Sequence, residues 1–213
     1  MPVGPAASRP TRSVAESELD ELAGVMARLR RECAWKANQT HESLTRYLLE
    51  ETYEVVEAIE SGDPAHLREE LGDLLLQVYF HAAIAAEDGQ YDINDVAGDL
   101  IAKLVRRNPH VFAPEQATAD PDDAAGIDAQ WERIKADEKQ RSSLMEGVPD
   151  ELPALLRAVK AVERLERGGT AVRVPDGDGV GDQLLALAVR AQREGLDPEQ
   201  ELRTAIRRLI EPR

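Results

Sequence analysis

Two segments with helical periodicity, residues 41–60 and 64–88, meet at the short sequence Ser-Gly-Asp-Pro at 61–64. Glycine suits the position just after a helix, and Asp-Pro suits an N-cap followed by the first helical residue. A connection this short makes consecutive helices antiparallel neighbours. The sequence therefore predicts a helical hairpin, and this hairpin constrains the fold more than any other feature.

Acidic residues lie on faces of this hairpin that are otherwise apolar. Glu51 falls inside the apolar stripe of the first helix, and Glu54 lies at the edge of that stripe. Glu70 and Asp73 lie beside the apolar face of the second helix. Because a helix rises 1.5 Å per residue, Glu54 and Glu70 stand at a similar height, roughly 10 Å from the turn, so these acids are expected to converge. The expected inner face of the second helix consists of Leu67, Leu71, Leu74, Leu75, Val78 and Ala82.

Converging carboxylates need a chemical explanation, because a carboxylate aimed into a core is costly unless something pairs with it. Like charges repel unless they are protonated or bound to cations, and hard divalent cations prefer oxygen ligands. Other acids of the hairpin, such as Glu50 and Glu57, lie further out, as solvated side chains do. The geometry therefore favours a metal site formed by Glu51, Glu54, Glu70 and Asp73.

Composition restricts the class of protein. The 213 residues are 42% hydrophobic but only 4% aromatic, which is typical of an Ala- and Leu-rich helical protein. The formal charge of -15 argues against duplex nucleic acid or an anionic membrane as the main partner. A single cysteine, Cys33, suits a reducing compartment, and the apolar run at 74–86 is too short to span a membrane. We expect a cytoplasmic protein.

The remaining segments also indicate helices, so the expected class is all-α. Residues 1–16 lack periodicity and are expected to form a flexible tail, followed by a first helix at about 17–32. A further helix should begin at Asp92 or Asn94 and end before Pro109. The later part of the chain is expected to contain a loop at 109–126 and helices at 127–141, 149–167, 182–194 and from 198 onwards.

Cationic and aromatic residues suggest further parts of a site without deciding their role. Lys103 and Arg107 project together from one side of a helix, either to balance the helix dipole or to hold phosphate oxygens. Trp131 and Lys135 share a face at the same spacing. Trp35 is either a hydrophobic anchor under a loop or a ring that stacks on a base, with the amide of the nearby Gln39 available for hydrogen bonds.

Several common kinds of site are absent from the sequence. There is no G-x-x-x-x-G-K-[ST] loop and no G-x-G-x-x-G, which are the usual phosphate-binding loops. The lack of Glu-x-x-His argues against a ferritin-like di-iron bundle. One cysteine and four scattered histidines argue against a zinc site.

Five ordered segments resemble the MazG nucleoside triphosphate pyrophosphohydrolases, over about residues 20–167. The first two are Trp35-x-x-x-Gln39-Thr40-His41-Glu42-Ser43-Leu44 and Glu50-Glu51-x-x-Glu54. The third is Leu67-Arg68-Glu69-Glu70-Leu71-Gly72-Asp73-Leu74-Leu75-Leu76-Gln77-Val78. The last two are Lys103-Leu104-Val105-Arg106-Arg107-Asn108-Pro109-His110-Val111-Phe112 and Trp131-Glu132-x-x-Lys135.

This resemblance implies an all-α fold of the four-helix-bundle type, completed by dimerisation into a homodimer or a higher homo-oligomer. It also implies Mg²⁺ as the cofactor, with Mn²⁺ as a substitute, and hydrolysis of nucleoside triphosphates to monophosphate and pyrophosphate in the clearance of unwanted nucleotides. Glu51, Glu54, Glu70 and Asp73 correspond to the metal ligands, and Glu50 and Glu54 are the candidate general bases. The implied substrate contacts are Lys103, Arg107, Trp131, Lys135, Trp35 and Gln39.

The chain departs from the family pattern in two places. Lys36 follows Trp35 where the family usually has Asp, which affects the expected base contacts. Residues 17–145 form the expected catalytic domain, whereas 146–213 resemble a degenerate second MazG-like domain without the E-E-x-x-E segment. The alternative is that the chain is a regulatory helical protein, which binds nucleotide or metal without catalysing a reaction.

Overall fold

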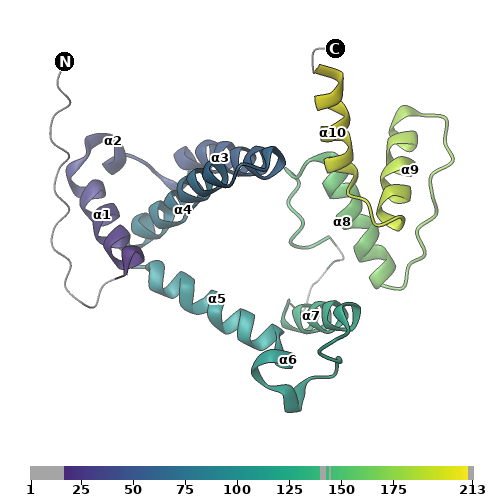
Figure 1. Cartoon of the computed structure of the whole chain (residues 1–213), viewed down its shortest axis with the longest axis horizontal. Helices are drawn as coiled ribbons and strands as arrows, with labels where there is room; N and C mark the ends of the chain where they lie inside the picture. The colour runs from purple at the N-terminus through teal and green to yellow at the C-terminus, as the bar shows by residue number, and fades with distance from the viewer. Residues whose placement is uncertain (1–16, 140–142, 144, 211–213) are drawn as a thin grey trace. The chain divides into compact units, whose positions relative to one another are not determined.

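A computed structural model describes residues 17–139, 143 and 145–210, and every regular element in these residues is helical (Figure 1). The expected all-α class is therefore confirmed, while the expected tail at 1–16 lies outside the described residues. None of the helices in this part of the chain combines the length and apolarity needed to cross a membrane. The chain forms two compact units that divide between Ile127 and Asp128.

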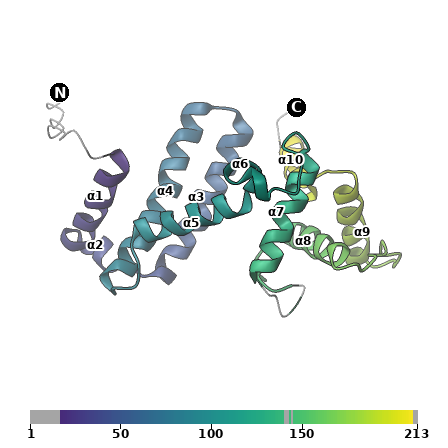
Figure 2. The same ribbon diagram turned by 90° about the horizontal axis from the view of Figure 1, so that it is seen from below.

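The helical hairpin is the central feature of the first unit. Helices α3 (His41–Ser61) and α4 (Pro64–Glu87) lie side by side and antiparallel, as Figures 1 and 2 both show. Gly62 ends α3 with a φ of 71°, a left-handed conformation that glycine adopts without steric cost. The Asp63 carboxylate accepts hydrogen bonds from the first backbone N–H groups of α4. The predicted hairpin and its turn chemistry are confirmed.

Three further helices of the first unit pack on the hairpin or on one another. α1 (Glu18–Glu32) packs against α4 and against the short α2 (Ala34–Ala37), and α5 (Ile93–Arg107) also contacts α4. These helices match the expected first helix and the expected start at Asp92. The buried core that joins α1, α3 and α4 consists of Met26, Leu44, Tyr79, Phe80 and Ile84.

The buried arginine Arg30 connects α1 to α2 and α4. Its guanidinium donates to both carboxylate oxygens of Glu87, at 2.8 and 2.5 Å, and to the backbone carbonyls of Lys36 and, at 3.0 Å, Gln39. The hydrogen bond from Arg30 is the main reason that the pKa of Glu87 is lowered. A charge this well hydrogen-bonded can be buried, and it holds the loop before α3 against the core.

The expected inner face of α4 is partly wrong. Leu71 and Val78 are 49% and 39% exposed, whereas Tyr79 and Phe80 are buried. Because this helix is apolar almost all round, its periodicity cannot show which side faces a neighbour. Contact with α1 determines which side of α4 is buried in the half of the helix that contains Tyr79 and Phe80.

The expected loop at 109–126 is also partly wrong. It contains a short helix α6 (Pro109–Phe112) and a 3₁₀ helix η1 (Pro114–Gln116). Proline is well suited to the first position of a helix, so the two prolines restart helical turns as well as ending the preceding ones. α7 (Ala124–Lys139) begins three residues earlier than expected, because the Asp123 carboxylate accepts a hydrogen bond from the Ala125 N–H.

The second unit consists of most of α7 with α8 (Ala154–Arg167), α9 (Val180–Arg193) and α10 (Pro198–Ile210). α8 begins later than the expected residue 149, since the residue before a proline disfavours helical geometry and Pro153 immediately precedes the helix. The last three helices contact one another. The expected domain boundary after residue 145 stays a prediction. The buried apolar residues of this unit are Val162, Ala188 and Val189.

Candidate metal centre

The acidic residues of the hairpin converge as expected. Glu51 on α3 and Glu70 and Asp73 on α4 each offer one carboxylate oxygen, and these three atoms lie within 4.8 Å of one another. Glu54 lies one helical turn after Glu51, close enough for the two carboxylates to repel each other. Glu50, the other candidate base, is exposed on α3. The structure therefore brings three of the four predicted ligands together at one place on the hairpin.

The electrostatics of this cluster suit a cation. Burial raises the pKa of Glu51, and repulsion from Asp73, Glu54 and Glu70 raises it further. A raised carboxyl pKa means that the ionised form of Glu51 lacks a compensating positive charge. All the donor atoms are carboxylate oxygens, the ligands preferred by Mg²⁺ and Mn²⁺. The residues present therefore fit a hard divalent cation.

One histidine beside the cluster was not identified from the sequence. The Nε2 atom of His66 lies 3.1 Å from a carboxylate oxygen of Glu70, whose side chain is only 12% exposed. The two residues are four apart on α4, a spacing that places side chains next to each other. That spacing could have identified the pair. His66 orients the Glu70 carboxylate from the side nearest the turn.

A polar stripe continues along α4 beyond the acids, through Gln77 to His81. The rings of His81 and His41 are stacked, with their Nδ1 atoms 2.7 Å apart. Burial, and then the proximity of His41, lowers the pKa of His81. The Nε2 atom of His81 is itself buried, so protonation would place a charge where solvent cannot reach. This end of the hairpin therefore favours a neutral imidazole pair.

The other predicted substrate residues of the first unit occupy varied environments. Lys103 is exposed on α5, whereas Arg107 is buried in the last turn of the same helix. Trp35 is half-exposed, with its ring edge-on to Tyr47 at a centroid distance of 5.9 Å. The amide of Gln39 donates to the Trp35 carbonyl at 3.0 Å and accepts from a neighbouring serine hydroxyl at 2.8 Å. The Gln39 amide thus already holds the loop together.

Trp131 and Lys135 belong to the second unit. The Lys135 ammonium lies 4.6 Å from the centre of the Trp131 ring and 2.7 Å from a carboxylate oxygen of Glu132. The expected shared face is confirmed, and the cation is held by both an aromatic face and a carboxylate. Their predicted contact with substrate stays a prediction.

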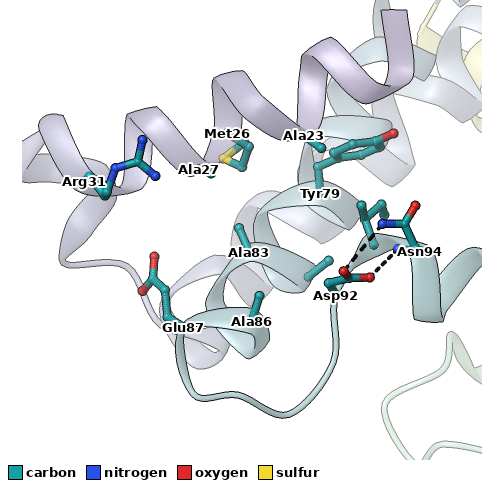
Figure 3. Close-up of a pocket in the computed structure, with 12 residues that line it drawn as sticks. Ala23, Met26, Ala27, Arg31, Tyr79, Ala83, Ala86, Glu87, Asp92 and Asn94 are labelled. Carbon is teal, nitrogen blue, oxygen red and sulfur yellow. Dashed lines mark hydrogen bonds between the residues drawn. The ribbon is translucent and has the colours of Figure 1, made fainter. Parts of the chain in front are cut away.

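A separate cavity of about 360 Å³ lies between α1, α4 and the start of α5 (Figure 3). Five of its twelve lining residues are alanine, Met26 and Tyr79 add apolar surface, and polar groups including Arg31 and Asn94 also line it. None of the predicted site residues lines it. This cavity is therefore distinct from the acidic cluster.

Comparison with known proteins identifies a family whose model covers the segment that contains these acids. The family model described as the MazG nucleotide pyrophosphohydrolase domain matches residues 39–112, which include the whole hairpin. An uncharacterized 26.1 kDa protein of Streptomyces cacaoi is 49% identical, over 89% of this chain and 78% of its own length.

Two relatives have names that state an activity. A nucleoside triphosphate pyrophosphohydrolase of Mycobacterium tuberculosis is 41% identical over 93% of this chain, which spans only 58% of that protein. A nucleoside triphosphate pyrophosphohydrolase/pyrophosphatase MazG of Thermotoga maritima is 37% identical over 90% of this chain and 82% of its own length. The expected relationship is confirmed: the chain belongs to the MazG family.

Proposed function

We propose that this protein hydrolyses nucleoside triphosphates at the α–β phosphoanhydride, giving nucleoside monophosphate and pyrophosphate in a reaction that depends on Mg²⁺. The observation that carries the proposal is the convergence of Glu51, Glu70 and Asp73, with Glu54 beside them. Membership of the MazG family supports it, because relatives are named as nucleoside triphosphate pyrophosphohydrolases.

The acidic cluster is the part of the site that would hold the metal. Glu51, Glu54, Glu70 and Asp73 supply the ligands, with Mn²⁺ as an alternative to Mg²⁺. Held by these residues, a divalent cation would supply a Lewis acid that neutralises the charge developed during phosphoryl transfer. Without a cation the same carboxylates would repel a triphosphate, so the proposed substrate and metal bind together.

The side chains of the chain then have distinct roles. Glu50 or Glu54 accepts the proton of the attacking water, and both are exposed enough for a water to reach them. Lys103, Arg107 and Lys135 contact phosphate oxygens, where their charges stabilise the leaving pyrophosphate. Trp131 packs near the nucleotide.

Base recognition belongs to Trp35 and Gln39 in this proposal. The half-exposed ring of Trp35 leaves one surface available for stacking. Gln39 uses one N–H and one lone pair within its loop, and an amide has two of each, so one donor and one acceptor are left for a base.

We also propose that the hairpin forms a homodimer, or a higher homo-oligomer, through its exposed apolar residues. Leu49, Tyr53 and Ile59 of α3 and Leu71 and Val78 of α4 are each at least 39% exposed. A second copy of the hairpin would cover them and build a four-helix bundle. Light scattering should show an oligomer, and Val78→Glu should dissociate it. The same change at the exposed Val174, outside the hairpin, should leave the oligomer intact.

Product analysis tests the reaction. The chain is incubated with a panel of ribo- and deoxyribonucleoside triphosphates, with and without Mg²⁺. Metal-dependent release of monophosphate and pyrophosphate is expected, and it should be lost in Glu54→Gln and Asp73→Asn but kept in Glu57→Gln. Diphosphate with orthophosphate would show that a different bond is cleaved. Nucleotide binding without turnover would favour the regulatory alternative.

The proposed setting is clearance of unwanted nucleotides in the cytoplasm. The formal charge of -15 supports a small nucleotide, rather than duplex nucleic acid or an anionic membrane, as the partner.

A further inference from the structure

The lysine Lys36 lies next to the residues proposed to recognise the base. It follows Trp35 directly on α2, and its ammonium lies 5.3 Å from the centre of the Trp35 ring. The same ammonium lies 5.3 Å from the centre of the Phe80 ring on α4. Both distances are within the range of cation–π contacts, so two aromatic rings hold this cation beside the proposed base site.

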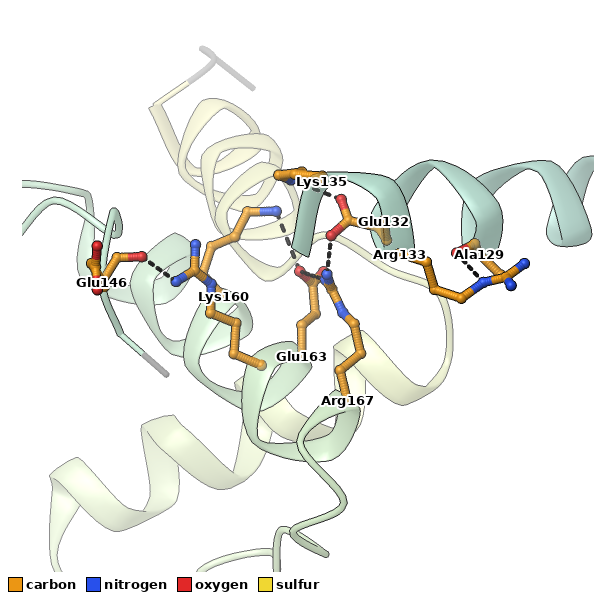
Figure 4. A network of polar contacts seen from close by, with 9 residues as sticks. Ala129, Glu132, Arg133, Lys135, Glu146, Lys160, Glu163 and Arg167 are labelled. Atoms are coloured by element: carbon orange, nitrogen blue, oxygen red, sulfur yellow. Dashed lines mark hydrogen bonds and ion pairs between the residues drawn. The ribbon is translucent and has the colours of Figure 1, made fainter. Parts of the chain in front are cut away.

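The ammonium of Lys36 has no anionic partner among the residues that the structure describes, and it forms no hydrogen bond with them. Lys135 of the second unit differs in this respect, because its ammonium contacts Glu132 at 2.7 Å (Figure 4). Lys160 likewise contacts Glu163 at 3.3 Å. An ammonium has three N–H donors, and those of Lys36 are therefore available to a ligand.

Hydrogen bonds from a buried arginine fix the backbone that carries Lys36. The Lys36 carbonyl accepts from the guanidinium of Arg30 and, at 3.2 Å, from the backbone N–H of Gln39. The same guanidinium donates to the Gln39 carbonyl at 3.0 Å, and Arg30 is only 7% exposed. One buried side chain thus sets the positions of both Lys36 and Gln39. A ligand that binds them meets a preformed backbone, which reduces the entropy lost on binding.

The position of Trp35 relative to the acidic cluster suits a single nucleotide. The centre of its ring lies 5.9 Å from the centre of the Tyr47 ring. Tyr47 precedes Glu51 by four residues on α3, which places the two side chains on adjacent turns of one face, about 6 Å apart along the helix axis. A base stacked on Trp35 can therefore belong to the nucleotide whose phosphates lie at the acidic cluster.

The chemistry of the ammonium restricts the base that it can pair with, because an ammonium donates hydrogen bonds and accepts none. Guanine presents an oxygen acceptor at position 6 and thymine presents one at position 4, whereas adenine and cytosine carry amino groups there. An ammonium opposite an amino group would leave two donors unpaired. Gln39 does not discriminate in this way, since its amide retains one donor and one acceptor.

We propose that Lys36 selects nucleotides whose base carries a carbonyl oxygen at this edge, namely 6-oxopurines and 4-oxopyrimidines, over those with an amino group there. This inference rests on the proposed hydrolysis and deepens it, because it names the class of substrate. The base stacks on the half-exposed ring of Trp35 while the Lys36 ammonium donates to the carbonyl oxygen. Gln39 pairs with a second group of the same base.

Two pairs of substrates isolate this contact. Inosine and adenosine triphosphates differ in having a carbonyl or an amino group at position 6, and uridine and cytidine triphosphates differ in the same way at position 4. Measured as kcat/KM in Mg²⁺, the wild type should favour the carbonyl member of each pair about tenfold, as expected for one charged hydrogen bond at a partly exposed site. Lys36→Met should remove the preference. Lys36→Arg, which keeps charged donors, should retain it.

Arg28→Met is the matched control for the loss of charge. It removes one cation from α1, where the Arg28 side chain is 72% exposed, and should leave both ratios unchanged. Ratios near one in the wild type, or a preference that survives Lys36→Met, would overturn the proposal. Absence of turnover with every triphosphate would instead count against the proposed hydrolysis. The base preference would then be measured by the quenching of tryptophan fluorescence by the same nucleotides, so the two failures are distinguishable.

Discussion

Glu51→Gln should have opposite effects on stability in the absence and in the presence of Mg²⁺. Without metal, the charge of Glu51 is unfavourable, because burial and the carboxylates of Asp73, Glu54 and Glu70 all raise its pKa. Glutamine keeps the size and the hydrogen-bonding capacity of the side chain and removes the charge. The metal-free variant should therefore be more stable than the wild type, although it loses a ligand.

The expected magnitude follows from the separation of the carboxylate oxygens, which lie within 4.8 Å of one another. Two unit charges at that distance repel by about 0.9 kcal/mol in water and by about 3.5 kcal/mol at an effective dielectric constant of 20. Glu51 is only partly buried, so the lower part of this range applies. We expect a gain of about 1–2 kcal/mol, which raises the melting temperature by roughly 2–8 °C for a chain of this size.

Thermal unfolding followed by circular dichroism measures both effects. In EDTA, Glu51→Gln should melt above the wild type. In Mg²⁺ at a hundredfold excess over its dissociation constant, the wild type should gain about 2.7 kcal/mol, and the variant should gain much less. Glu57→Gln makes the same change at an exposed position of α3 and should behave like the wild type in both solutions. Sodium chloride at equal ionic strength separates metal binding from screening.

The reasoning fails if Glu51→Gln melts below the wild type in EDTA, because the cluster would then not be repulsive. It also fails if Mg²⁺ stabilises the variant and the wild type equally, because the bound cation would then lie elsewhere.

Three further predictions concern the first unit. Arg30→Met should lower the free energy of unfolding, measured by urea titration, by about 2–3 kcal/mol, since it removes charged hydrogen bonds. Glu87→Gln should lower it by only about 1 kcal/mol, because the side chain of Glu87 is half-exposed. Equal losses would contradict the buried role of Arg30. Gly62→Ala should lower the free energy of unfolding by about 1 kcal/mol in the same assay. The cost comes from backbone strain alone, because no atom lies within 4 Å of an added Cβ. An unchanged urea midpoint would argue against the left-handed conformation at Gly62. The pKa of His81 is lowered in the folded protein. As the pH falls, His81 therefore takes up a proton in the unfolded chain at a higher pH than it does in the folded chain. Stability should therefore be greatest above the unfolded pKa of about 6.5 and decrease below it, and His81→Gln should flatten that slope in urea titrations between pH 5 and 8.

The helices were largely predictable because their ends depend on neighbouring residues. Thr40, Asp63, Asp92 and Asp197 each cap the helix that follows them, through hydrogen bonds that span two or three residues. The misplaced start of α8 and the missed α6 both involve prolines, which are compatible with either the end or the beginning of a helix.

The acidic cluster was predictable for a related reason. A short turn between two helices sets their relative register, so residues at equal distances from Gly62 come close together, as Glu51 and Asp73 do. The contact of His66 with Glu70 follows from the same helical spacing. The cavity lined by Lys135 and Lys160 was not predictable, since these residues lie on two different helices, α7 and α8, and no local spacing relates them.

The sequence by itself determined the helical class, the hairpin, its caps and the meeting of Glu51, Glu70 and Asp73, because these depend on contacts within a few residues or across one tight turn. Only the tertiary structure decided which side of α4 is buried, since an almost uniformly apolar helix fits a neighbour on any side and contact with α1 makes the choice. Tertiary packing likewise decided the pairing of Arg30 with Glu87, residues 57 positions apart that no local spacing relates.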